Sequence, residues 1–148
     1  MTVAADVQQI YYSDVNSVGN PMLPNLQTHL LGNDEGAGFG WDDMTVYKFG
    51  VQWQSSPEWT WRLGYSVANQ PIPDSEMPFN ILAPGVIEQH LTAGFTKALG
   101  NNNELNIALM RAFSKSVEGP NTLEVPGQQT IELKMDQWEV SAGYAWKF

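Results

Sequence analysis

Residues 59–67 decide the fold, and they read Trp59-Thr60-Trp61-Arg62-Leu63-Gly64-Tyr65-Ser66-Val67. Every odd position in this stretch is large and apolar, and every even position is small or polar. Such alternation is typical of a β-strand, because successive side chains of a strand point to opposite faces of the sheet. The sequence therefore predicts a strand here with one strongly apolar face.

The same period of two recurs along the chain and predicts six strands in a single domain, residues 1–148. The residues from 138 to 148 alternate Trp, Val, Ala, Tyr, Trp and Phe with mostly small or polar residues. The first strand changes phase at Gln8-Gln9, which predicts a β-bulge there. The expected strands cover about 2–15, 45–55, 58–69, 87–99, 104–115 and 134–148.

The connections between these strands alternate in length. Residues 55–58 and 100–103 are short and have turn residues, whereas 16–44, 70–86 and 116–133 are long. No segment has a helical period. Consecutive antiparallel strands with short turns on one side and long loops on the other are typical of an outer-membrane β-barrel.

Composition excludes several classes of protein. The chain has 43% hydrophobic but only 16% charged residues, a net charge of -9 and no Cys, against the roughly 25% charged residues of ordinary soluble domains. Disulfides and cysteine nucleophiles are therefore excluded. The acidic balance argues against nucleic acid as a partner. The chain has no apolar run long enough for a transmembrane helix.

The two strand faces do not suit a soluble sandwich, in which the face away from the core is charged and solvated. The second face is mostly Gly, Ser, Thr, Ala and Gln, which suits a confined polar lumen, and the apolar face would contact lipid. Membrane barrels carry aromatic girdles at both interfaces. The aromatic residues here also form two groups: Trp53, Trp59, Trp61, Trp146 and Phe148 near the short turns, and Tyr11, Tyr12, Trp41, Tyr47 and Trp138 near the long loops.

Six strands are too few to close a barrel, since small closed barrels begin near eight strands. An open sheet cannot span a membrane alone, because its edges would be unpaired. Either several chains associate, or the chain is the C-terminal part of a larger barrel. Residues 1–6 lack the features of a signal peptide, which favours the second interpretation. At the other end, Tyr144, Trp146 and Phe148 match the C-terminal signal that the barrel assembly machinery reads.

Several stretches carry a more specific signal: Gly40-Trp41-Asp42-Asp43-Met44, Tyr47-Lys48-Phe49-Gly50-Val51-Gln52, Trp59-Thr60-Trp61-Arg62-Leu63-Gly64-Tyr65, Asn69-Gln70-Pro71-Ile72-Pro73-Asp74-Ser75-Glu76, Phe79-Asn80-Ile81-Leu82-Ala83-Pro84-Gly85 and His90-Leu91-Thr92. Together they resemble the FadL/TodX family of outer-membrane transporters for hydrophobic compounds. The likeness covers nearly the whole chain from about residue 40 onward, and more loosely the first strand and loop. Ordinary porins share the alternation but not these loop segments.

The resemblance implies an all-β fold, a transmembrane antiparallel up-and-down barrel of about fourteen strands, of which these would be the last six. It also implies an N-terminal plug and passive uptake of long-chain fatty acids or aromatic hydrocarbons across the outer membrane of a Gram-negative bacterium. The implied partners are membrane lipid and lipopolysaccharide, the barrel assembly machinery, the upstream part of the same barrel and a hydrophobic substrate. Fatty-acid members use basic residues near the ligand carboxylate, but loop 16–44 offers only His29, with Ala37 near where a Lys is expected. A neutral, hydrocarbon-like substrate therefore remains open.

Seven positions on the second face are predicted to line the lumen: Lys48, Gly50, Arg62, Gly64, Gly94, Glu139 and Gly143. The glycines would either leave space for a plug or a ligand, or relieve crowding and permit curvature of the sheet. The charged members would either form an internal ion-pair network or contact the polar head of a ligand. His90, at a strand start, is expected at the lumen or its rim.

The long loops contain two further groups of candidates. Six apolar residues would contact a ligand near the outer rim, or pack over the barrel mouth: Leu30, Leu31, Phe79, Ile81, Leu82 and Val86. Nine acidic residues are expected to be solvated, to bridge lipid headgroups through divalent cations, or to contact a ligand: Asp34, Glu35, Asp42, Asp43, Asp74, Glu76, Glu118, Glu124 and Glu132.

The sequence does not predict an enzyme. It has no G-x-S-x-G motif around a nucleophile, no motif beside His29 or His90, no phosphate loop and no metal-ligand spacing. We therefore expect no catalysis, no cofactor and no metal. Two alternatives to a transporter remain, namely a structural or adhesive outer-membrane barrel and a soluble lipocalin-like lipid binder.

Overall fold

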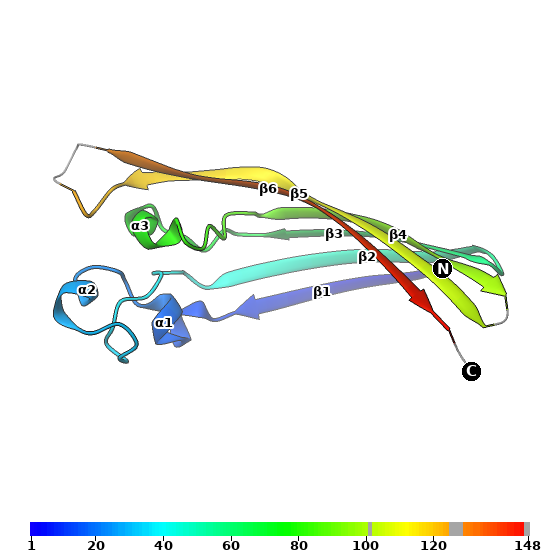
Figure 1. The fold of residues 1–148 in the computed structure, drawn as a ribbon, viewed down its shortest axis with the longest axis horizontal. Coiled ribbons are helices and arrows are strands. Elements are labelled where there is room, and N and C mark those ends of the chain that lie inside the picture. Colours follow the sequence, from blue (N-terminus) through cyan, green and yellow to red (C-terminus); the bar gives the residue numbers. More distant parts are fainter. Residues whose placement is uncertain (101, 125–128, 147–148) are drawn as a thin grey trace.

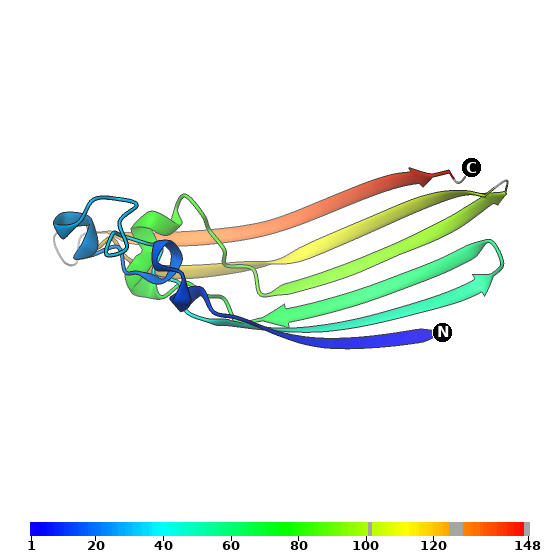
Figure 2. The ribbon, with the colours of Figure 1, turned by 90° about the horizontal axis from the view of Figure 1, so that it is seen from below.

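Six antiparallel strands form one sheet in which chain order and spatial order coincide. The computed structural model describes residues 1–100, 102–124 and 129–146. Figures 1 and 2 show the strands side by side, with the long loops at one end and both termini near the other. The strands are β1 Thr2–Ile10, β2 Met44–Ser56, β3 Trp59–Ala68, β4 Gln89–Gly100, β5 Asn103–Pro120 and β6 Thr130–Ala145. The all-β, up-and-down prediction is confirmed.

The first strand differs from its prediction in two ways. It ends at Ile10 instead of near residue 15, because the chain then turns into a 3-10 helix. The bulge expected at Gln8-Gln9 is absent, since β1 pairs with β2 in one unbroken register. Both glutamines fit the regular strand: Gln8 accepts a hydrogen bond from Lys48 Nζ at 2.6 Å, and Gln9 accepts one from Thr45 Oγ1 at 2.6 Å.

Short helices interrupt the two long loops in which the sequence showed no helical period. The first loop contains η1 Tyr12–Asp14, α1 Asn16–Gly19 and α2 Asn25–Thr28. The second contains η2 Asp74–Glu76 and α3 Met77–Asn80. Segments of three or four residues are too short to display a repeating helical face. We call residues 11–43 and 69–88 together the loop cap.

The hairpin of β5 and β6 is longer than predicted. Half of the segment expected as a loop, 116–133, is strand, and the pairing reaches Pro120 and Thr130. One irregularity interrupts the ladder: β5 advances from Ala112 to Lys115 while β6 advances only from Gln137 to Met135. The extra residue is a β-bulge in β5.

Strand pairing aligns the apolar positions of all six strands on one face, which we call the outer face. One row of paired residues crosses it through Val3, Val51, Leu63, Ala93, Leu109 and Val140. The alternate residues form the inner face. Large apolar side chains of the outer face are exposed, among them Val140 at 72% and Phe49 at 57%. The sheet by itself therefore leaves this apolar surface uncovered.

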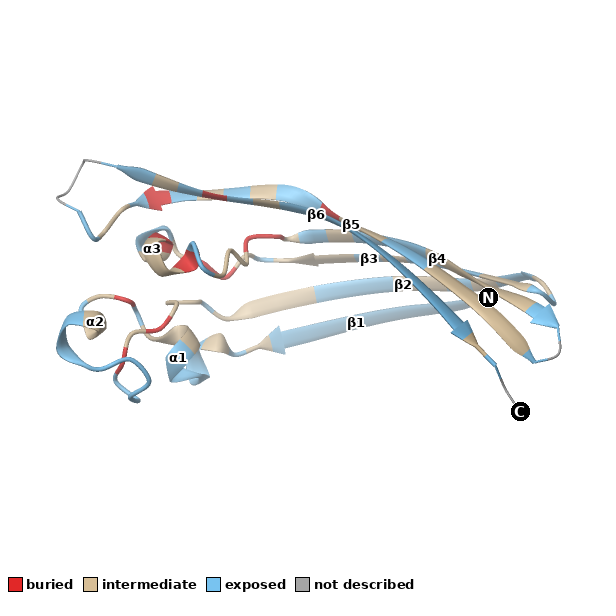
Figure 3. Ribbon diagram, in the orientation of Figure 1, coloured by how far each residue is buried: buried red, intermediate tan, exposed pale blue. Residues whose placement is uncertain are grey.

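The buried core lies at the loop end of the molecule (Figure 3). It consists of Ile72, Met77, Val86 and Leu133, against which four partly buried residues pack: Trp41, Val117, Ile131 and Met135. The core thus joins the loop cap to the inner face of the β5–β6 hairpin. Within the described part of the chain, no helix is both long enough and apolar enough to cross a membrane.

Candidate functional site

The inner face contains a hollow of about 470 Å³ over strands β3 to β6. Its inward side chains are small or polar, because alternation places Thr92, Gly94, Asn106, Ser141 and Gly143 on this face. Arg62 borders the hollow from β3. The hollow is open, and a few hydrogen-bonding groups border a lining that is otherwise apolar, with Phe95, Ile107 and Ala108 also contributing to it.

Arg62 is held in place by neutral partners from the neighbouring strands. Its Nε donates to Gln52 Oε1 at 2.8 Å, and its Nη1 donates to Thr96 Oγ1 at 2.7 Å. Thr96 Oγ1 in turn donates to Asn106 Oδ1 at 2.5 Å. Four strands thus contribute to one polar network. Only Arg62 among these four residues was predicted, because cross-strand partners depend on register, which the sequence did not define.

The predicted ion-pair network among Lys48, Arg62 and Glu139 does not form. Lys48 Nζ lies 3.8 Å from Asp6 Oδ2. Glu139 is on β6, separated from Arg62 by strands β4 and β5. Within the residues described, no ion pair joins any two of the three. They share the inner face but belong to different clusters, so their role in lining a lumen stays a prediction.

The four inward glycines fall into two classes. A Cβ on Gly94 would lie 2.8 Å from the carbonyl oxygen of Ile107, and one on Gly64 would lie 2.5 Å from Thr92 Oγ1. At Gly50 and Gly143 the nearest atom would be 3.9 Å away. Close approach of a neighbouring strand explains Gly94, and crowding by a movable side chain partly explains Gly64. For Gly50 and Gly143, it stays a prediction that the absence of a side chain leaves space for a plug or a ligand.

The six apolar loop candidates do not form one surface. Val86 is fully buried in the core, so it cannot contact a ligand, and packing is its role. Phe79 is partly buried, with its ring 6.3 Å from that of Phe39. Four others are exposed, in two different loops: Leu30, Leu31, Ile81 and Leu82. Ligand contact by these four stays a prediction.

A buried asparagine, which the sequence did not single out, joins the two loops of the cap. Asn80 is 0% exposed. Its Oδ1 accepts from Trp41 Nε1 at 2.6 Å, and its Nδ2 donates to the carbonyl oxygens of Phe39 and Glu76. Glu76 Oε2 also accepts from the backbone N–H of Met22 at 2.9 Å. Trp41 and Phe39 lie 39 and 41 residues from Asn80 in sequence, so no local pattern could reveal their part in this cluster.

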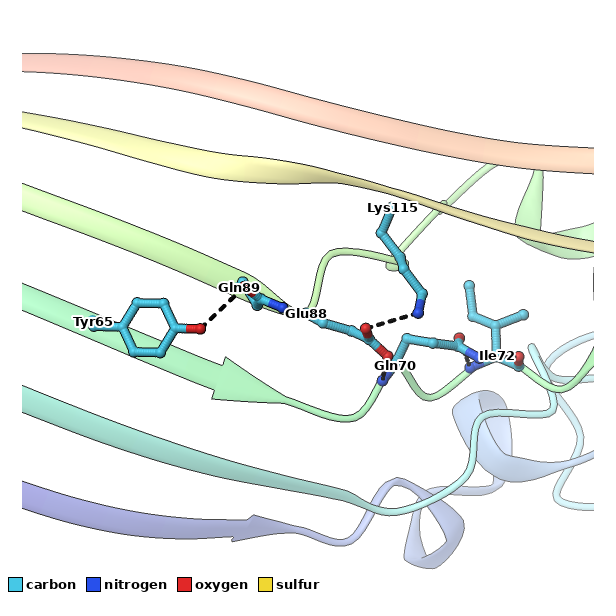
Figure 4. A network of polar contacts seen from close by, with 6 residues as sticks. All are labelled: Tyr65, Gln70, Ile72, Glu88, Gln89 and Lys115. Atoms are coloured by element: carbon cyan, nitrogen blue, oxygen red, sulfur yellow. Dashed lines mark hydrogen bonds and ion pairs between the residues drawn. The ribbon is translucent and has the colours of Figure 1, made fainter.

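Figure 4 shows a second polar cluster where the loop cap meets the sheet. Lys115 Nζ pairs with Glu88 Oε2 at 2.8 Å, and Glu88 Oε1 accepts from the backbone N–H of Gln70 at 3.4 Å. The Gln70 side chain bonds to both backbone polar groups of Ile72. The cluster fixes the start of β4 against β5, directly after the bulge.

The acidic loop residues are dispersed. Asp43 Oδ1 accepts from the backbone N–H and the hydroxyl of Ser13, at 3.0 and 2.8 Å, so it stabilises the loop. Glu118 and Glu132 lie on strands and not in a loop as predicted. Over residues 1–100, 102–124 and 129–146, no three His, Asp or Glu side chains are grouped closely enough to hold a metal ion. Bridging to lipid headgroups and contact with a ligand stay predictions.

The remaining predicted residues are placed as follows. His90 lies on the inner face at the start of β4, with Nδ1 3.5 Å from Ser66 Oγ. Tyr144 and Trp146 are exposed, with ring centroids 6.0 Å apart. Phe148 lies outside the described residues. The assembly signal itself stays a prediction.

Comparison with known proteins supports the fold. No family model and no curated protein matches the chain. Two crystal structures of the Pseudomonas putida toluene transporter TodX are similar, with TM-scores of 0.62 and 0.59 at 19% and 18% sequence identity. They cover 99% and 96% of this chain, which spans 30% of the TodX chain in each case. The resemblance expected from the sequence is thus confirmed at the level of the fold: the chain is folded like one part of the TodX β-barrel.

Proposed function

We propose that this chain contributes six strands to an outer-membrane β-barrel through which small hydrophobic compounds diffuse into a Gram-negative cell. The observation that carries the proposal is the distribution of side chains between the two faces of the sheet. Exposed apolar residues cover the outer face, whereas the hollow on the inner face is bordered by Arg62, Thr92, Asn106 and Ser141. A barrel wall that separates lipid from a polar lumen needs this distribution. The fold similarity to a toluene transporter agrees with it.

A soluble lipocalin-like binder would need the opposite distribution, with a polar outside and an apolar inside. The described residues place Trp138, Val140 and Phe49 on the exposed outer face instead. An adhesive barrel would share this sheet, so an uptake assay has to separate it from a transporter. The proteins named in the comparison are transporters, which favours transport, and we assign no catalytic step to this chain.

The substrate class follows from the loops. The loop cap, residues 11–43 and 69–88, contains no Lys or Arg, and its acidic residues would repel a carboxylate. We therefore propose neutral, hydrocarbon-like compounds as the preferred substrates, ahead of long-chain fatty acids. Passive diffusion requires only a path along which such a molecule is neither excluded nor trapped.

The barrel needs further strands, because β1 and β6 are each paired on one side only within the described sheet. In lipid those edges must be closed. We propose that upstream strands of the same protein close them, in line with the 30% of the TodX chain that these residues span. Membrane lipid and lipopolysaccharide outside, and the assembly machinery during insertion, would be the other partners.

An uptake assay tests the transport proposal. Gly64→Trp in the full-length protein adds bulk to the inner face, whereas Leu63→Trp adds the same side chain to the outer face. We expect uptake of a labelled aromatic hydrocarbon to fall several-fold with Gly64→Trp and to be nearly normal with Leu63→Trp, at equal amounts of folded protein in the membrane. Loss of the whole gene should abolish uptake. Unchanged uptake in both the deletion strain and the Gly64→Trp strain would refute the proposal.

A further inference from the structure

Strand β6 presents its apolar residues to opposite sides in its two halves. Near the loops, Ile131, Leu133 and Met135 face inward and belong to the core or pack against it. Near the C-terminus, the outward residues Trp138 and Val140 are apolar and exposed, at 65% and 72%. The strand itself is continuous between the halves. The change therefore reflects a change in what surrounds the strand, not a change in its backbone.

In the loop-end half of β6, the face opposite the apolar residues is charged. In the loop-end half, the outward positions of β6 are Glu132, Lys134 and Asp136, all exposed. A charged side chain is tolerated on the lipid side of a barrel only near or beyond the interface, because its cost rises toward the bilayer midplane. The outer face of the loop-end half thus suits water, and that of the other half suits hydrocarbon.

The place along β6 where the apolar side changes contains residues that are typical of a membrane interface. Arg111 is paired with Trp138 in register, and its guanidinium lies 4.9 Å from the centre of that ring. Its Nη1 reaches Asp136 Oδ2 at 2.7 Å, toward the loops. In the same row, the hydroxyl of Tyr65 donates to Gln89 at 3.0 Å, also toward the loops. Trp, Tyr and a snorkelling Arg are the residues that membrane interfaces favour.

A second aromatic and cationic level lies near the short turns. Lys97 Nζ is 5.0 Å from the centre of the Trp59 ring, and the Trp59 ring stacks on Trp61. Leu91 of β4 lies in the row of Arg111, and Lys97 is six positions further along the same strand. At about 3.4 Å per residue that is about 20 Å. Strands of membrane barrels tilt by about 40°, so this length spans about 15 Å along the bilayer normal. The apolar band of membrane barrels is roughly 25 Å tall, and side chains that reach outward at both levels cover the remainder.

We propose that on strands β4 to β6 bilayer hydrocarbon covers the outer face only between the Arg111–Trp138 level and the Trp59–Lys97 level. The β5–β6 hairpin from the bulge onward stands clear of the hydrocarbon, with its charged side in water and its apolar side against the loop cap. This assignment rests on the proposed membrane location and adds to it where the lipid boundary lies. The lipid partner is a bilayer with phosphate headgroups, which the cations at the two levels complement.

Nitroxide labelling tests the boundary, and these 148 residues contain no cysteine that would interfere. Single cysteines replace Val140 and Lys134 of β6, both outward and exposed, in the full-length protein in phosphatidylcholine–phosphatidylglycerol vesicles. Collisions with oxygen report hydrocarbon, and collisions with a water-soluble nickel chelate report water. Leu109 and Ser116 of β5 provide a second pair across the same boundary. A difference in electrophoretic migration between unheated and heated samples confirms that each variant is folded.

We expect the ratio of oxygen to nickel collisions to be several-fold higher at 140 than at 134, and likewise at 109 than at 116. High ratios at all four positions would overturn the boundary but leave the membrane proposal intact. Low ratios at all four would overturn both proposals. Exclusion of both probes at 140 together with spin–spin broadening would show that a second copy covers this face, and would overturn the boundary as well.

Discussion

The two halves of the β5–β6 hairpin are built from the same kind of alternating sequence but bury opposite sides. In the loop-end half, Leu133 is 6% exposed and contacts the loop cap. In the other half, Val140 is 72% exposed on the outer face. A strand thus specifies two faces but not which of them is covered by protein. What lies beside the sheet decides that, namely the cap at one end and, as we propose, lipid at the other.

The largest expected effect comes from a charge in the cap-covered half. Leu133→Asp removes a buried apolar side chain and leaves a carboxylate without a partner, so we expect a loss of about 4 kcal/mol in the free energy of unfolding. Urea unfolding of the full-length protein in vesicles measures it. The neighbouring exposed Lys134→Asp should cost less than about 0.5 kcal/mol. Equal effects at both positions would contradict the comparison.

A charge in the other half tests the lipid side. We expect Val140→Arg to destabilise the protein by about 3 kcal/mol, because an Arg near the bilayer midplane is costly on the lipid face of a barrel. Ser141→Arg, one residue further and on the inner face, should have little effect, since a polar lumen tolerates charge. Urea titrations in vesicles again give both values. A larger loss at 141 than at 140 would mean that inner and outer faces have been exchanged.

The polar anchor of the cap should have a smaller effect that is confined to the loops. Asn80→Ala leaves Trp41 Nε1 and two carbonyl oxygens without their partner, at a cost of about 2 kcal/mol in local stability. Hydrogen exchange of the amides of Phe39 and Trp41 should accelerate, while amides of β2 and β3 keep their protection. Asn33→Ala, at an exposed loop position, serves as the control. Faster exchange throughout the sheet would show that cap and sheet are one cooperative unit.

The smallest effect is expected where cap and sheet meet. The Glu88–Lys115 pair is partly exposed, at 25% and 40%, so Glu88→Gln should cost only about 0.5 kcal/mol, and less at high salt. A double-mutant cycle with Lys115→Met isolates the pair. A coupling energy well above 1 kcal/mol would show that this junction holds the cap more firmly than its exposure indicates.

Much of the fold could be predicted, because the alternation of apolar and polar residues is a local property that does not depend on how the strands pair. All six strands were found from it, and so was the apolar outer face. The ends of β5 and β6 were missed, because the apolar positions of β6 change from odd to even between Met135 and Trp138. Only the cap, which arrives from residues more than 40 positions earlier, makes Leu133 part of a core.

The candidate site was less predictable than the fold. The period of two correctly predicted that Arg62 and Gly64 lie on the inner face. It did not predict their partners, because Thr96 and Gln52 reach Arg62 only in the observed register. Gly119 is a further example: a Cβ there would collide with the backbone of Asp74, so a side chain would keep η2 from approaching β5. Nothing in the residues around Gly119 indicates that requirement.

The sequence by itself determined that this chain forms strands with one apolar and one polar face, since each side chain's direction depends only on its place in the alternation. Only the tertiary structure decided which apolar residues are covered by protein and which are left exposed. That outcome depends on contacts between distant segments, such as Asn80 with Trp41 and Met77 with Leu133. Burial is a property of the neighbours that a residue acquires, and a local pattern cannot contain them.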